Sequence, residues 1–70
     1  MTGLEIKAQI VLLGKTQKQM VESINRMTDV KTDTTELCRA LKSDKYEKYT
    51  KVKKAAEKVL EVWRYDLTKI

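Results

Sequence analysis

The side chains with the clearest recognition chemistry fall on one face of a short predicted helix near the middle of the chain. Leu37 and Leu41 lie one helical turn apart, which places Thr35, Arg39 and Lys42 on the opposite, exposed side. A hydroxyl, a guanidinium and an ammonium group can all donate hydrogen bonds to a polar or anionic partner. If this helix recognises a ligand, these three residues are expected to contact it.

Residue types that support catalysis are almost missing from the chain. With no histidine and one cysteine, Cys38, the inventory excludes zinc sites, catalytic triads and thiol–histidine dyads. Gly3 and Gly14 are too far apart to form a glycine-rich phosphate loop, and the carboxylates are scattered among lysines. We therefore expect no enzymatic activity, no metal and no cofactor, and we expect Cys38 to be a half-buried core residue.

Two short amphipathic helices are expected to position the recognition residues. Thr16 and Gln19 have the spacing of a capping box, and Asp33 and Glu36 repeat that spacing before the second helix. In the first helix of the pair an apolar stripe is predicted to face the core, at Met20, Val21, Ile24 and Met27. The polar positions predicted to point away from the core are Lys18, Glu22, Asn25 and Arg26. The stretch MTDVKT between the helices is expected to form the turn, with Val30 reaching the core.

The segment before this pair is predicted to be a helix from about Gly3 to Leu13. Thr2 and Glu5 form another capping box, and Gly14 is well placed to end the helix in a left-handed conformation. The predicted helix has two apolar stripes on nearly opposite sides. One stripe consists of Ile6, Ile10 and Leu13, and the other of Leu4, Ala8, Val11 and Leu12. Either the helix is sandwiched between two others, or Leu12 and part of the second stripe face a partner.

The last segment is predicted to be one long helix from about Tyr46 to Tyr65. Its apolar residues recur at threes and fours, and Trp63 is expected to anchor the core rather than to stack on bases. Lys51, Lys54 and Lys58 line the opposite face, where a solvated face and a phosphate-contacting stripe are the two interpretations.

These elements predict an all-α fold, a compact four-helix bundle containing a helix-turn-helix, in one domain over residues 1–70. The net charge of +5 and the pI near 9.4 favour a polyanionic partner such as nucleic acid. A single cysteine is typical of the reducing cytoplasm, and no signal peptide or membrane-spanning run is recognised. We therefore expect a soluble cytoplasmic protein without a membrane partner.

Three stretches carry a family likeness: TGLEIKAQIVLLGKTQKQM, TELCRALKS and KVKKAAEKVLEVW. They resemble the Cro/repressor-type (lambda-repressor-like) helix-turn-helix proteins, in particular short members of prophage or mobile-element type. The resemblance extends from Thr2 to about Trp63.

The resemblance implies a third helix that lies in the major groove of double-stranded DNA, in a homodimer on two half-sites one helical turn apart. Gln17 would then contact a backbone phosphate at a helix N-terminus, and Lys18 and Lys42 are expected to bind phosphates as well. The positions that would contact bases are Lys31, Thr32, Thr34, Thr35 and Arg39, with Arg39 the candidate for a bidentate guanine contact.

Three functions follow from this reasoning. The first is a small sequence-specific DNA-binding regulator of transcription. The second is a phage-type inhibitor, such as an antirepressor or an anti-CRISPR-like protein, that uses the same scaffold to bind a host protein. The carboxylates on the third predicted helix and the surplus leucines of the first predicted helix motivate this second function. The third is an assembly element that dimerises through its last helix. Residues expected at a dimer or partner surface are Leu12, Val62, Trp63, Leu67 and Ile70.

Overall fold

The chain folds into four α-helices, as seen in a computed structural model that describes the backbone of residues 2–68 and the side chains of residues 2–66. The helices are α1 (Gly3–Leu12), α2 (Gln17–Met27), α3 (Thr34–Lys42) and α4 (Glu47–Thr68). The predicted all-α four-helix bundle is confirmed, and the predicted boundaries differ from the observed ones mainly at the end of the last helix. All four helices contact one another.

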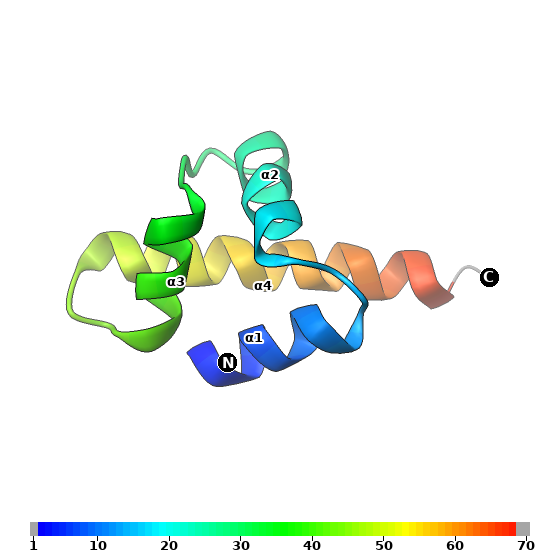
Figure 1. Cartoon of the computed structure of the whole chain (residues 1–70). Helices are drawn as coiled ribbons and strands as arrows, with labels where there is room; N and C mark the ends of the chain where they lie inside the picture. Colours follow the sequence, from blue (N-terminus) through cyan, green and yellow to red (C-terminus); the bar gives the residue numbers. More distant parts are fainter. Residues whose placement is uncertain (1, 69–70) are drawn as a thin grey trace.

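The long helix α4, of 22 residues, is the support on which the other three pack. In Figure 1, α1 lies below α4, α2 crosses above it, and α3 lies against its N-terminal half. The core is formed by the inward faces of all four helices and consists of Ile6, Ile10, Met20, Val21, Ile24, Leu37, Ala40, Leu41, Val52, Ala55, Ala56, Val59 and Leu60. Val30 and Trp63 are half-buried against this core, as predicted.

The first helix begins and ends with hydrogen-bonded caps that the sequence predicted. The Thr2 hydroxyl accepts from the Glu5 amide at 3.2 Å, and the Glu5 carboxylate accepts from the Thr2 amide at the same distance. At the other end Gly14 has φ of 70°, and the amides of Gly14 and Lys15 donate to the carbonyls of Val11 and Ile10. This pair of bonds is a Schellman motif, whose left-handed residue favours glycine.

The caps of α2 and α3 differ in one respect from the prediction. Thr16 and Gln19 form a complete capping box, with bonds of 3.1 and 2.9 Å. The Asp33 carboxylate accepts from the Glu36 amide at 2.7 Å, but the Glu36 side chain does not return the bond. That half of the predicted box is wrong because the Glu36 carboxylate pairs with Lys48 of α4, with Nζ 3.1 Å from Oε2.

The backbones of α1 and α3 come close together at Gly3. A Cβ atom added there would lie 2.5 Å from the carbonyl carbon of Leu41 and 2.8 Å from its Cα, closer than ordinary van der Waals contact. Gly3 is itself buried. Any other residue at this position would therefore push the N-terminus of α1 away from the last turn of α3.

The outer stripe of α1 is exposed, so of the two alternatives for this helix the one in which two other helices cover both stripes is wrong. Leu4, Val11 and Leu12 are exposed by 78%, 69% and 77%, whereas Ile6 and Ile10 on the opposite side are buried. The other helices reach α1 only from its inner side.

Candidate nucleic-acid interface

The outward side of α3 carries the three residues that the helical period placed there. Thr35, Arg39 and Lys42 are exposed, while Leu37, Ala40 and Leu41 are buried against the other helices. At 1.5 Å of rise per residue, the span from Thr35 to Lys42 is about 10 Å, the length of about three base-pair steps at 3.4 Å each. An exposed helix of this kind fits the roughly 12 Å width of the DNA major groove.

A small hollow joins α3 to the N-terminal turns of α1 and α2. Its volume is about 50 Å³, close to that of one or two water molecules at ≈30 Å³ each, and its lining includes Gln17, Lys42, Lys7 and Cys38. The structure thus brings together Gln17 and Lys42, two of the three predicted phosphate-contacting residues. Lys7 is a third polar group that the sequence reasoning missed, because its neighbours on α2 and α3 are distant in the chain.

The electrostatics of this hollow are positive. Two lysines line it and no carboxylate does. In helix geometry the amides of Gln17 and Lys18, at the start of α2, have no acceptor within the helix and carry the positive end of its dipole. The exposed Lys18 lies beside them. This arrangement can hold an anionic group such as a phosphate oxygen, and it is too small for a nucleotide or an organic cofactor.

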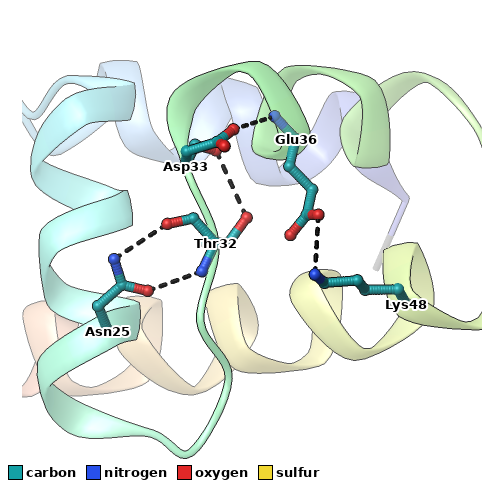
Figure 2. Close-up of polar contacts among 5 residues, drawn as sticks. All are labelled: Asn25, Thr32, Asp33, Glu36 and Lys48. Atoms are coloured by element: carbon teal, nitrogen blue, oxygen red, sulfur yellow. Dashed lines mark hydrogen bonds and ion pairs between the residues drawn. The ribbon is translucent and has the colours of Figure 1, made fainter.

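The connection between α2 and α3 is held by Asn25, whose role the sequence reasoning got wrong. Asn25 was expected to point to solvent, but its amide forms two hydrogen bonds with the backbone of Thr32 (Figure 2). Nδ2 donates to the Thr32 carbonyl at 3.0 Å, and Oδ1 accepts from the Thr32 amide at 2.8 Å. The bonds fix the extended segment directly before the Asp33 cap, and so they fix where α3 begins relative to α2.

The two residues before that cap are placed differently from the exposed stripe of α3. Thr32 is half-buried and Lys31 is exposed, but the Lys31 ammonium donates to the Asn25 carbonyl at 2.8 Å. Lys31 lines a separate open hollow of about 650 Å³ near the start of α4, together with Asp29 and Glu47. Of the five predicted base-contacting residues, the structure therefore exposes Thr34, Thr35 and Arg39 on α3 itself, and it places Lys31 and Thr32 at the connection.

Glu36, although part of α3, does not share the outward stripe. Its carboxylate is directed at Lys48 of α4 (Figure 2), and Oε1 is buried without a hydrogen-bond partner. The second carboxylate of this region, Asp33, is occupied by the helix cap. Both acidic groups are thus bound within the protein.

The predicted dimer or partner surface is described only in part. Leu12 is exposed, Val62 is exposed by 37%, and Trp63 is half-buried with the Lys15 ammonium 5.6 Å from its ring centroid. The side chain of Leu67 and the whole of Ile70 lie outside the described residues. Among the residues that are described, no group of histidine, cysteine and carboxylate side chains could hold a metal ion.

Comparisons with protein-family models, with curated proteins and with solved structures found no match to this chain. In the part of the chain that the structure covers, no helix has the length and apolar content needed to cross a membrane.

Proposed function

We propose that this protein is a small sequence-specific DNA-binding regulator of transcription, of phage or mobile-element type. The observation that carries the proposal is the continuity between the exposed stripe of α3 and the positive hollow at the start of α2. Thr35, Arg39 and Lys42 face outward, and Lys42 also lines the hollow with Gln17. One side of the molecule therefore combines groups that can contact base edges with groups that can contact phosphates.

In this proposal α3 enters the major groove and Arg39 donates two hydrogen bonds to a guanine. Lys18, Lys42 and the free amides at the start of α2 bind the sugar–phosphate backbone and fix the register of α3. The ion pair between Glu36 and Lys48 supports the proposal, because it offsets the charge of one of the two carboxylates of α3 that would otherwise repel DNA.

The test compares equilibrium binding of Arg39 and Lys18 variants to a selected DNA site and to unrelated DNA. Arg39→Ala should weaken binding to the selected site by about 5- to 150-fold, the equivalent of roughly 1–3 kcal/mol, with a smaller effect on unrelated DNA. Lys18→Ala should weaken binding to the selected site and to unrelated DNA alike. It should also reduce by about 1 the steepness with which the logarithm of the binding constant falls with the logarithm of the salt concentration. Arg64→Ala is the matched control, since it removes the same charge from an exposed position in the C-terminal part of α4. Equal effects of the Arg39 and Arg64 changes on specificity would contradict the proposal.

The exposed outer side of α1 favours a second candidate function, an inhibitor that binds a host protein. Leu4, Val11 and Leu12 form an apolar surface of a kind that commonly marks protein contacts. Retention of a host protein after nuclease treatment, lost in a Leu12→Glu variant and unaffected by Arg39→Ala, would favour this function over DNA binding.

A further inference from the structure

The exposed stripe of α3 lies between two flanks of that helix. With successive side chains about 100° apart, Cys38 and Glu36 lie about 160° apart across the outward side, and the three residues of the exposed stripe fall within this arc. The flank at Cys38 adjoins the positive hollow that Gln17 lines. The flank at Glu36 adjoins α4, where the Glu36 carboxylate pairs with the Lys48 ammonium (Figure 2). The phosphate contacts of the proposed function all lie on the first flank.

A helix that lies in the major groove has a phosphate backbone on each side. The groove is about 12 Å wide, and an α-helix with its side chains is about 10–12 Å across, so both flanks of the helix come close to phosphates. If the Cys38 flank faces the backbone of one strand, the Glu36 flank therefore faces the backbone of the other strand. This inference rests on the proposed function, because it takes α3 as the helix in the groove.

The ion pair on the Glu36 flank presents its positive end to solvent. The Lys48 side chain is exposed by 61% and the Glu36 side chain by 22%, and Oε1 of Glu36 is buried. An ammonium has three N–H donors, and the contact with Glu36, at 3.1 Å, needs one of them. Glu36 also has the spacing to accept from the Asp33 amide, but its carboxylate is directed at Lys48 instead. A group that approaches from solvent therefore meets an ammonium with free donors, and the carboxylate lies behind it.

We propose that the Lys48 ammonium binds a phosphate of the second strand, across the groove from Gln17, and that Glu36 is the positioning residue that directs it there. The contact holds α3 from both flanks and so fixes its rotation in the groove. Asp29 and Glu47 line the hollow beside Lys48. Because their carboxylates repel further phosphates, the ligand is a single phosphate and not a longer stretch of backbone.

Equilibrium binding of labelled duplexes, followed by fluorescence anisotropy, measures the contact. Lys48→Gln should weaken binding to the selected site and to unrelated DNA by similar factors. One phosphate contact gives a salt slope of about 0.9, so this loss should be about 3.5-fold larger at 50 mM than at 200 mM salt. Lys58→Gln is the matched control, because it removes an exposed lysine from the same helix about 15 Å further along the axis. It should weaken binding less than about twofold at either salt concentration.

Loss of Lys48 also leaves the Glu36 carboxylate without its partner, so the contact must be separated from repulsion by that carboxylate. Glu36→Gln removes the negative charge and keeps an oxygen that can accept from the Lys48 ammonium. In this background Lys48→Gln should still weaken binding, with the same salt dependence. Glu36→Leu removes the acceptor, and in that background the loss caused by Lys48→Gln should fall by at least half. Circular dichroism of each variant checks that the helix content is unchanged.

Neutral methylphosphonates, placed one at a time along each strand of the selected site, assign the strand. A phosphate bound by Lys48 should matter less once Lys48→Gln has removed its partner, which a double-mutant cycle detects as a departure from additivity. Lys48→Gln should couple to one phosphate, and Lys42→Gln should couple to a phosphate on the opposite strand. Lys58→Gln should couple to neither.

Three results would overturn the Lys48 contact: equal binding by the Lys48→Gln and Lys58→Gln proteins, disappearance of the Lys48→Gln loss in the Glu36→Gln background, or coupling of Lys48 and Lys42 to the same strand. The failure of the proposed function looks different. In that case the wild type shows no binding that depends on Arg39, and both proposals fall. Specific binding that depends on Arg39, without any effect of Lys48, would refute only the contact proposed for Lys48.

Discussion

Removing the Asn25 amide should loosen the connection that sets the position of α3. The Asn25→Ala change deletes the two hydrogen bonds to the backbone of Thr32, at 3.0 and 2.8 Å, and leaves the half-buried amide and carbonyl of Thr32 without those partners. Each bond contributes about 0.5–1.5 kcal/mol net, so the free energy of unfolding should fall by about 2 kcal/mol. At about 0.05–0.15 kcal/mol per residue, a chain of this length has a total stability of only ~4–10 kcal/mol.

Urea denaturation followed by far-UV circular dichroism measures this loss. Thermal unfolding followed by the same signal should show a Tm lowered by about 10 °C, because 1 kcal/mol corresponds to about 4–8 °C in a domain of this size. Glu22→Ala is the matched control one turn earlier on α2, at an exposed position, and its effect should stay within about 0.5 kcal/mol. Asn25→Asp should fall between the two variants, because it keeps the acceptor for the Thr32 amide and loses the donor to the carbonyl. An Asn25→Ala protein as stable as the Glu22→Ala protein would refute the reasoning.

Two further changes test the contacts that position α1 and α3. Gly3→Ala should lower the free energy of unfolding, measured by urea denaturation, by about 1–3 kcal/mol, because the added Cβ meets the backbone of Leu41. This loss should exceed the gain from the better helix propensity of alanine. An unchanged or raised stability would show that the close approach is not required. Asp33→Ala should lower the free energy of unfolding by about 1 kcal/mol, because it removes the helix cap. Asp33→Asn should keep the stability, since asparagine caps a helix equally well, and it should tighten DNA binding because it removes a negative charge. Equal stabilities for the two Asp33 variants would mean that the cap contributes little.

The helix boundaries were predictable because they depend on local signals. Thr2, Thr16 and Asp33 each place an oxygen at the spacing that a helix N-terminus requires, and Gly14 supplies the left-handed residue that ends α1. The apolar periods likewise identified the buried sides of α2, α3 and α4, although Met27, predicted to face the core, is 40% exposed. For α1 the period left two opposite stripes open, and the structure buries the one that contains Ile6 and Ile10. These features depend on residues of a single helix and its ends, so no knowledge of the tertiary structure was needed.

What could not be predicted depends on contacts between segments distant in the chain. Helical period places Asn25 on a polar side, but it cannot reveal that the folded connection returns to that side. Glu36 has the correct spacing for a capping box, but its carboxylate forms an ion pair with Lys48 of α4 instead. A signal for Gly3 was present in its residue type, because a glycine inside a predicted helix can mark a close backbone approach. Lys7 belongs to the candidate site only because α1 packs against α2 and α3 in the folded chain, which the sequence alone does not reveal.

Selection of bound fragments from a random DNA pool, at two salt concentrations and with the whole 70-residue chain, tests the proposed function most directly. The proposed function predicts an enriched pseudo-palindromic sequence that is lost at the higher salt concentration, and that is also lost when Arg39→Ala replaces the wild type. A well-folded protein that enriches no sequence at either salt concentration would contradict it and would favour a protein partner for the same scaffold.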